Sequence, residues 1–154
     1  VDRLGVSSIN QYCRSLGLSS TIINTGNLLI KNNHHQTSVN DMIRFLKLLL
    51  HQQFLSPKQT TVMLNYMVDQ RYGWGLRKYL DSNVVVASKT GTLRHLAFDV
   101  GIISHPHMQY LIAIHVQHPT RKYHSLRHDV AQLSKAIYDL LTIYYNRGYG
   151  YCIK

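Results

Sequence analysis

A change of hydrophobic period near Val84 constrains the fold of this chain more than any other feature of its sequence. Upstream of it, apolar residues recur at helical spacing, whereas Val84-Val85-Val86 opens an apolar strand that continues into Ser88-Lys89-Thr90-Gly91-Thr92. Two further β-rich runs follow, and His105-Pro106-His107-Met108 between them is typical of a hairpin. The pattern therefore predicts three consecutive antiparallel strands within residues 83–118.

Helical patterns lie on both sides of these strands. Helices are predicted over 5–16, where Gly17 is the stop signal, and from Ser38, where Asp41 follows at capping-box spacing. Ser56-Pro57 opens a third helix. A fourth, over 125–145, is predicted from one apolar stripe: Val130, Leu133, Ile137, Leu140, Leu141 and Tyr144. The order predicts an α+β fold in which helices flank a mostly antiparallel sheet.

Two stretches lack a regular pattern. Residues 18–36 are rich in Asn, Ser and Thr and contain no acidic residue, and a loop this long in a compact domain is usually functional. Residues 146–154 form a tail rich in Tyr and Gly, which we expect to be loosely held. We interpret residues 1–154 as one partial domain, with 18–36 as a loop of the active-site type.

The charge balance excludes some classes of function. Lys and Arg number 17 and acidic residues 7, so the formal net charge is +10. Hydrophobic residues make up 45% and charged residues 16%, which excludes a disordered polyelectrolyte. The charge is spread evenly, with 8 basic and 3 acidic groups in residues 1–77 and 9 and 4 in the rest. This pattern favours a cationic surface that attracts anionic substrates over a specific nucleic-acid site.

Several residue types are scarce. All seven acidic residues are Asp, so no step that requires Glu can run on this chain alone. The two cysteines, Cys13 and Cys152, are too few for a disulfide framework, and we expect both to be free. No apolar run approaches the roughly 20 residues that span a bilayer. The first residues show no signal-peptide pattern.

The ten histidines suggest a metal site as a rival interpretation. His34-His35, His105 with His107, His115 with His118, and His124 with His128 all have spacings seen in metal sites. No cysteine lies near any of these pairs, and only Asp129 is an acidic neighbour. We therefore predict no metal and no other cofactor, and expect these histidines on loops and helix surfaces.

The tetrapeptide Lys89-Thr90-Gly91-Thr92 gains meaning from its position after an apolar strand and before a hairpin and a long helix. In this order the chain resembles the second half of the penicillin-recognising serine enzymes, the class A β-lactamases and low-mass D-Ala-D-Ala peptidases, whose motif set includes K-T-G. The resemblance runs from about Gly5 to about Leu141. Further stretches that carry it are 9–17, Thr37-Ser38, Leu55 to Gln59 and Gly73-Trp74-Gly75.

The resemblance implies roles for four residues. Lys89 would place a cation beside the substrate carboxylate and lower the local proton affinity. Thr90 would offer its hydroxyl to that carboxylate, and Gly91 would let the substrate lie close to the strand. The backbone N–H of Thr92 would be one oxyanion-hole donor, which stabilises the charge of a tetrahedral intermediate. Lys89 and Thr92 are thus the candidate catalytic residues, and Thr90, Gly91 and Thr92 the candidate substrate-binding residues.

The chain departs from the family pattern at three points. No Ser is followed three residues later by Lys, and no Ser-Asp-Asn occurs, so the family's nucleophile and proton-shuttle motifs are missing. The loop over 18–36 lacks the Glu with which class A β-lactamases activate water for deacylation; Asn24 and Asn27 could orient a water but cannot act as bases. By itself the chain is predicted to be catalytically inactive, and the parent protein to deacylate slowly.

Three hypotheses of function follow. The first is part of a serine hydrolase or acyltransferase that acts on β-lactams or the D-Ala-D-Ala stem peptides of peptidoglycan. The second is a non-catalytic cell-wall or partner-binding relic of the same fold, and the third a cationic nucleic-acid binder. The resemblance also implies an extracytoplasmic location. Without the family's first half, the chain would expose a sheet edge and an apolar face, which that half or a second copy should cover.

Overall fold

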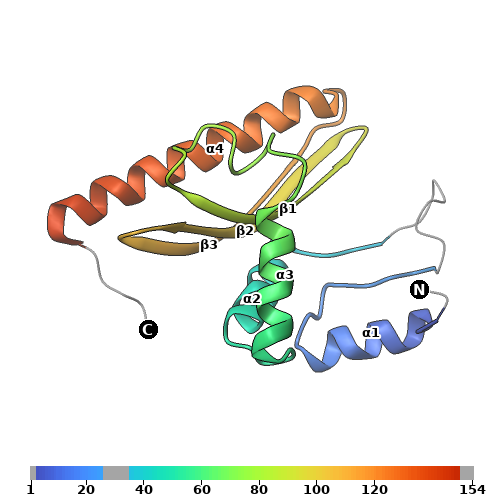
Figure 1. Ribbon diagram of the computed structural model, residues 1–154. Helices are drawn as coiled ribbons and strands as arrows, with labels where there is room; N and C mark the ends of the chain where they lie inside the picture. Colours follow the sequence, from blue (N-terminus) through green and yellow to red (C-terminus); the bar gives the residue numbers. More distant parts are fainter. Residues whose placement is uncertain (1–2, 26–34, 150–154) are drawn as a thin grey trace. The chain divides into compact units, whose positions relative to one another are not determined.

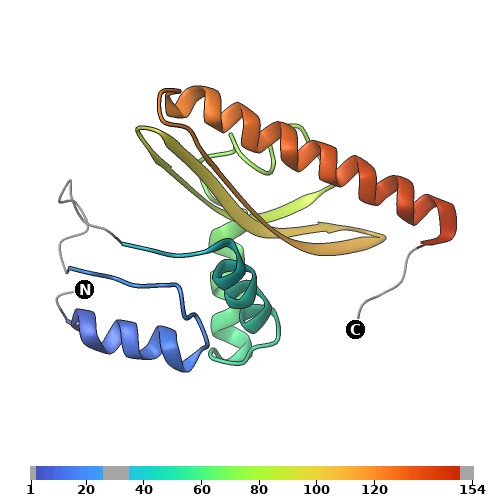
Figure 2. The ribbon, with the colours of Figure 1, turned by 180° about the vertical axis from the view of Figure 1, so that it is seen from behind.

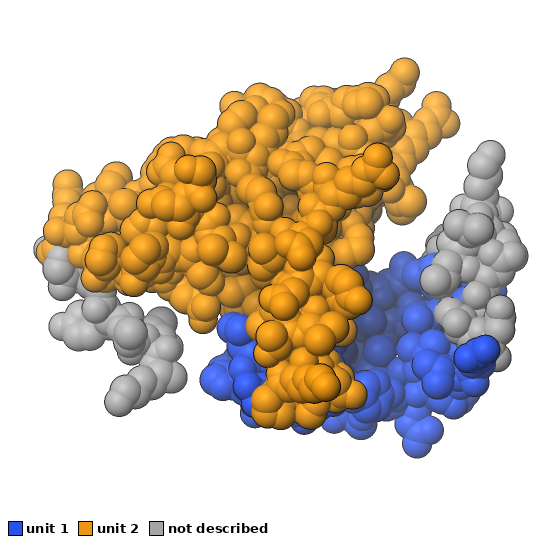
Figure 3. All heavy atoms as spheres, viewed as in Figure 1, with its two compact units in different colours: residues 1–54 blue, residues 55–154 orange. Residues whose placement is uncertain are grey.

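The computed structural model describes residues 3–25 and 35–149, which belong to two compact units (Figure 3). The first unit comprises residues 1–54 and the second residues 55–154. No helix in the described ranges is long and apolar enough to cross a membrane. Cys13 is a free thiol, and Cys152 lies outside the described residues. That residues 1–154 form one domain stays a prediction.

The first unit contains helices α1 (Val6–Ser15) and α2 (Val39–Leu50). Ser38 caps α2, because its side chain accepts a hydrogen bond from the backbone N–H of Asp41, as the sequence predicted. The Asp41 carboxylate does not complete a capping box. It turns to the loop before the helix and accepts hydrogen bonds from Ser20 N–H at 2.9 Å and the Thr21 hydroxyl at 2.7 Å.

The described parts of the loop predicted over 18–36 are held by hydrogen bonds. Ile22 and Gln36 form an isolated antiparallel bridge that brings the two limbs of the loop together. The Asn10 side chain of α1 pairs with the backbone of Ile23 in both directions, donating to its carbonyl at 2.7 Å and accepting from its N–H at 2.8 Å. Residues 26–34 of this loop lie outside the described residues.

The second unit begins with helix α3 (Pro57–Val68), whose start has the predicted form. Ser56 and Gln59 make a reciprocal capping box, and Pro57 stands in the first turn, where its missing N–H costs no hydrogen bond. Three strands follow, β1 (Val85–Leu93), β2 (Leu96–His105) and β3 (Met108–Gln117), and pair antiparallel in sequence order. The three-stranded antiparallel sheet and the α+β class are thereby confirmed.

Helix α4 (Tyr123–Tyr144) packs along one face of the sheet, as Figures 1 and 2 show from opposite sides. The core between them is apolar and fully enclosed, with Val86, Ala97 and Ile103 from the sheet against Leu126 and Val130 from the helix, each at most 1% exposed. Burial of the Val, Leu and Ile side chains in this set stabilises the fold by about 1.5 to 3 kcal/mol each. The hydrophobic core cluster lies entirely within this unit.

The stripe that predicted α4 from the sequence is not the stripe that the helix buries. The buried residues are Leu126, Val130, Ala131, Ser134 and Tyr138, and only Val130 belongs to the predicted set. Leu133, Ile137, Leu140 and Tyr144 are between 36% and 56% exposed. The helix is apolar on two faces, and Ala131 and Ser134, which let it lie close to the sheet, carry no strong hydrophobic signal.

The C-terminal end of α4 also differs from the expected loose tail. The helix passes directly into a π-helical turn, Tyr145–Tyr149. The ring of Tyr145 stacks on His107 from the β2–β3 hairpin, with centroids 5.5 Å apart. This contact gives the extension a partner in the sheet. Residues 150–154 lie outside the described residues.

Candidate functional site

Strand β1 forms one edge of the sheet and carries all four predicted site residues near its C-terminal end. Lys89 pairs with Val100 of β2, and Thr92 pairs with Ala97. Alternation along a strand therefore puts Lys89 and Gly91 on one face of the sheet, and Ser88, Thr90 and Thr92 on the face that α4 covers.

Lys89 is exposed, and its ammonium group is not paired with a carboxylate anywhere in the described ranges. Its Nζ donates a hydrogen bond to the carbonyl of Thr90 at 2.7 Å. That carbonyl lies on the outer edge of the sheet, so the cation is held beside the edge. An unpaired lysine held at this edge can attract and orient a carboxylate.

The direction of the Thr92 N–H follows from the hairpin register. Leu93 pairs with Leu96 across the two-residue turn Arg94-His95, and the closing pair of such a turn is the one that exchanges hydrogen bonds. Since hydrogen-bonded and non-hydrogen-bonded pairs alternate, the N–H groups of Thr92 and Thr90 point away from β2. The carbonyl of Val86, which lies on the same register, accepts from the Arg77 guanidinium at 2.6 Å, as an outward-facing group should.

Thr90 is buried at 6% exposure rather than open on the surface. Its outward N–H and its hydroxyl both face the side-chain oxygen of Gln70, at 3.5 Å and 3.4 Å. The amide nitrogen of Gln70 donates a hydrogen bond to the Ser88 hydroxyl. Gln70 thus lies along the sheet edge beside the Thr90 hydroxyl, at the position that the family resemblance gives to a substrate carboxylate.

Gly91 has a packing reason to be glycine. A Cβ atom at this position would lie 2.1 Å from the ring of Phe98, its partner on β2. The aromatic ring fills the space over the strand that a side chain would take. The predicted close approach at Gly91 is therefore made, within this chain, by Phe98.

Asp99 is a buried carboxyl behind the site that the sequence analysis did not single out. It is 1% exposed, and its Oδ2 accepts hydrogen bonds from Leu76 N–H at 2.8 Å and the Ser88 hydroxyl at 3.4 Å. Burial raises its pKa to about 6, although the hydrogen bonds from Leu76 and Ser88 and the charge of Lys89 oppose the rise. Oδ1 is buried and has no hydrogen-bond partner among the described residues.

Gly75, in the Gly73-Trp74-Gly75 stretch, leaves room for this carboxyl. A Cβ at Gly75 would lie 2.2 Å from Asp99 Oδ2, so only glycine lets the chain pass close enough for Leu76 to donate its N–H. The sequence analysis identified this glycine only as part of a stretch that carries the family resemblance. Its tertiary role depends on a residue 24 positions downstream.

A groove of about 490 Å³ runs between α3 and the start of the motif on β1. Its wall is largely apolar and comes from α3. Polar groups gather at the β1 end, where Gln70, Ser88 and Lys89 line it. The residues from the α3 side are Leu55, Lys58, Gln59, Val62, Met63, Tyr66 and Met67. The groove offers apolar surface next to a cation, a combination that suits an amphipathic anion.

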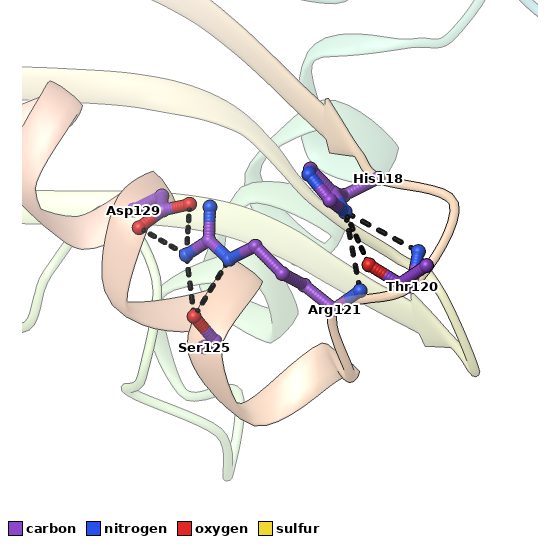
Figure 4. Close-up of polar contacts among 5 residues, drawn as sticks. All are labelled: His118, Thr120, Arg121, Ser125 and Asp129. Atoms are coloured by element: carbon purple, nitrogen blue, oxygen red, sulfur yellow. Dashed lines mark hydrogen bonds and ion pairs between the residues drawn. The ribbon is translucent and has the colours of Figure 1, made fainter.

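A second polar cluster fixes the approach to α4 (Figure 4). The Nδ1 atom of His118 accepts from the backbone N–H groups of Thr120 and Arg121, both at 3.2 Å. The Arg121 guanidinium then reaches Ser125 and pairs with Asp129 at 2.7 Å. The cluster turns the chain from β3 into α4.

The histidine spacings do not build a metal centre in the described part of the chain, where no three metal-binding side chains gather. His105 contacts His107 and Tyr138, His124 contacts Tyr123, and His128 contacts Tyr79, all ring to ring. His34 lies outside the described residues. These histidines therefore act in packing and turns.

Comparison with known proteins decides the family. The sequence model of the "Beta-lactamase enzyme family" matches residues 1–141. The chain belongs to this family. The resemblance to the penicillin-recognising serine enzyme family is thereby confirmed. No curated protein sequence matches the chain.

Solved structures show the same fold. PBP-A is similar at 25% identity and a TM-score of 0.80, over 90% of this chain and 52% of that one. The TLA-1 extended-spectrum β-lactamase has 22% identity and a TM-score of 0.81, over 89% and 55%. A class A β-lactamase from Bacteroides cellulosilyticus has 21% identity and a TM-score of 0.80, over 89% and 54%. This chain thus spans about half the length of these relatives.

Proposed function

We propose that this family member supplies the substrate-binding edge of a penicillin-recognising serine acyl enzyme that acts on β-lactams or D-Ala-D-Ala peptides. The observation that carries the proposal is the end of β1. There the Lys89 ammonium, which pairs with no carboxylate among the described residues, and the outward N–H of Thr92 lie three residues apart on the outer edge of the strand. One group suits a substrate carboxylate and the other a developing oxyanion.

The reaction is an acyl transfer. A serine hydroxyl from outside this motif attacks the carbonyl carbon of the substrate amide, and the oxygen gains charge as the tetrahedral intermediate forms. The N–H of Thr92 donates to that oxygen. When the intermediate collapses, the C–N bond breaks, the nitrogen takes up the proton that the serine hydroxyl gave up on attack, and the serine keeps the acyl group as an ester. Lys89 holds the carboxylate of the substrate throughout.

Deacylation is the slow step in this proposal. Hydrolysis of the ester needs a base that takes a proton from water, and the chain has no Glu at all. The loop over 18–36 has no acidic residue of any kind. The proposed protein therefore traps penicillin as a penicillin-binding peptidase would, rather than destroying it.

The nucleophile must come from outside these 154 residues, since they contain neither S-x-x-K nor Ser-Asp-Asn. Two exposed surfaces of the second unit support a covering partner. Strand β3 is the outer strand opposite β1, and the second apolar face of α4, Leu133, Ile137 and Leu140, is exposed. We propose that the N-terminal half of the fold covers both, and that the assembled protein works outside the cytoplasm on peptidoglycan stem peptides.

The second candidate is a non-catalytic relic that binds cell-wall polymers. It is favoured by the position of Gln70, which contacts the Thr90 hydroxyl and so occupies a group that the substrate carboxylate would need. In this case the +10 charge would bind anionic polymers without any covalent step.

Intact-mass spectrometry with benzylpenicillin tests the proposal. The 154-residue chain and a form extended upstream to include a nucleophile motif are each incubated with the drug. We expect a stable adduct of one penicillin on the extended form only. No adduct on either form would support the relic, and an adduct on the 154-residue chain would contradict the absence of a nucleophile from it.

A matched pair of lysine variants places the site. Lys89 and Lys58 both line the groove, but only Lys89 belongs to the motif. Lys89→Gln is expected to slow adduct formation about 100-fold and Lys58→Gln to leave it within about twofold. Equal effects of both substitutions would assign the groove a general electrostatic role.

A further inference from the structure

Arg127 of α4 reaches the end of the motif strand and is held there by two aromatic rings. Its Nη2 donates to the Thr92 hydroxyl at 3.2 Å, although the two residues are 35 positions apart. The guanidinium carbon lies 4.8 Å from the Trp74 ring centre and 4.6 Å from that of Tyr123. A guanidinium between two aromatic faces keeps its charge while losing most of its freedom.

The β1–β2 turn that follows Thr92 is tied to the approach of the same helix. The carbonyl of Arg94 accepts from Tyr123 N–H at 3.2 Å, and that of His95 accepts from His118 N–H at 3.1 Å. Within residues 3–25 and 35–149, no strand pairs with the outer side of β1. The peptide at Thr92 is thus fixed from the α4 side, and the one side-chain tie to Thr92 among the described residues is Arg127.

Arg127 has no carboxylate partner in the described ranges, and its Nε is buried without a hydrogen bond there. An arginine whose role was only to fasten the helix would gain more from a carboxylate, such as that of Asp129, which binds Arg121 instead. The Arg127 charge therefore lies close to the end of β1 and is not neutralised by a carboxylate of the described residues.

We propose that Arg127 is a positioning residue for acyl transfer: by holding the Thr92 side chain, it sets the direction in which the Thr92 N–H meets the oxyanion. The inference rests on the proposed function, since it needs a reaction in which charge develops at that N–H. In this role Arg127 acts through the Thr92 side chain and not on the reacting atoms. Its contribution depends on the Thr92 hydroxyl, and Trp74 and Tyr123 supply the clamp.

A double-mutant cycle on the acylation rate tests the positioning role. Arg127→Gln and Thr92→Val are made singly and together in the upstream-extended form, and the adduct rate is measured against penicillin concentration. Either single substitution should lower the limiting acylation rate about tenfold with half-saturation unchanged, and the double variant should be no slower than either. Thr92→Ser, which keeps the acceptor, should restore the rate.

The matched control is Lys135→Gln, which removes a cation from the same helix where it pairs with Asp139. Its acylation rate should equal that of the wild type. If Arg127→Gln and Thr92→Val were instead additive, or if the control slowed equally, Arg127 would act through general charge or helix stability and the proposal would be overturned.

A measurement on the 154-residue chain separates this proposal from the proposed function. Trp74 is the sole tryptophan, so its emission reports the clamp, and the Thr92 amide shift reports the peptide. Arg127→Gln should move both. If both move while the wild-type extended form gains no adduct, the proposed function fails and the tie exists without catalytic meaning. If neither moves, the positioning role is overturned whatever the activity.

Discussion

The motif strand of the second unit and the long loop of the first unit are held in place by different interactions. In the second unit, α4 and the sheet enclose an apolar core whose central residues are at most 1% exposed. In the first unit, side chains bind backbone across the chain, as Asn10 does with Ile23 and Asp41 with Ser20. The comparison teaches that the strand with the site motif rests on bulk packing, whereas the long loop rests on a few directional hydrogen bonds.

The largest effect should come from the apolar core. Leu126 is fully buried between α4 and the sheet, and Leu126→Ala should lower the free energy of unfolding of the second unit by about 4 kcal/mol through lost burial and a cavity. Urea denaturation followed by circular dichroism measures it. Leu133→Ala, on the exposed face of the same helix, serves as the control and should cost less than about 1 kcal/mol in the isolated chain.

The buried carboxyl of Asp99 makes the stability of the second unit depend on pH. Because the folded pKa of Asp99 is about 6 and its unfolded value 3.8, the folded state binds more protons between these values. Its contribution to stability is therefore greatest below pH 3.8 and is lost as the pH rises through 6, by about 3 kcal/mol in total. Urea melts between about pH 4 and pH 7 measure this. The free energy of unfolding of Asp99→Asn should fall by about 3 kcal/mol less over this range than that of the wild type. Parallel curves for the two proteins would refute this assignment.

In the first unit, the largest effect should come from loss of the Asp41 carboxylate. Asp41→Ala removes two accepted hydrogen bonds and should lower the free energy of local opening at the loop by about 2 kcal/mol. Hydrogen exchange of the Ser20 amide reports that opening directly. Asp81→Ala, in an exposed turn of the second unit, removes the same charge and should leave Ser20 protection unchanged.

The smallest effect is expected where one amide side chain joins α1 to the loop. Asn10→Ala should cost about 1 kcal/mol, because both hydrogen bonds to Ile23 can be replaced by water at this partly buried position. The exchange rate of the Ile23 amide should rise severalfold. Gln11→Ala, on the exposed next position of the helix, is the control, and an equal rise there would mean that helix propensity and not the tie was measured.

Local patterns in the sequence predicted the helices and strands. The features that the sequence did not predict depend on tertiary contacts. The caps at Ser38 and Ser56, the hairpin at Pro106-His107 and the three strands all depend on residues within a few positions of one another. The buried face of α4 was predicted wrongly because small residues, Ala131 and Ser134, contact the core while larger apolar residues face outward.

The same reasoning explains what was missed at the site. The motif residues were found by their order in one strand, and their catalytic roles stay predictions. Asp99, Gln70 and Arg127 act on β1 from 10 to 38 positions away from its Lys89. A scan for isolated apolar-strand carboxylates would have flagged Asp99, since ionisable groups are rare on a strand face that is otherwise apolar. Nothing local distinguishes Arg127 from the other exposed-looking cations of the helix.

The two-residue turn after β1 has a consequence for how this family can change over time. Its length determines which peptide groups of the strand look outward, so one inserted or deleted residue between Leu93 and Leu96 would exchange the outward N–H of Thr92 for that of a neighbour. Descendants can replace the exposed Arg94 by other amino acids, whereas the ring of His95 hydrogen-bonds the carbonyl of Arg121 at 2.9 Å. We expect selection to remove insertions and deletions at these two codons wherever the outer edge of β1 still takes part in catalysis.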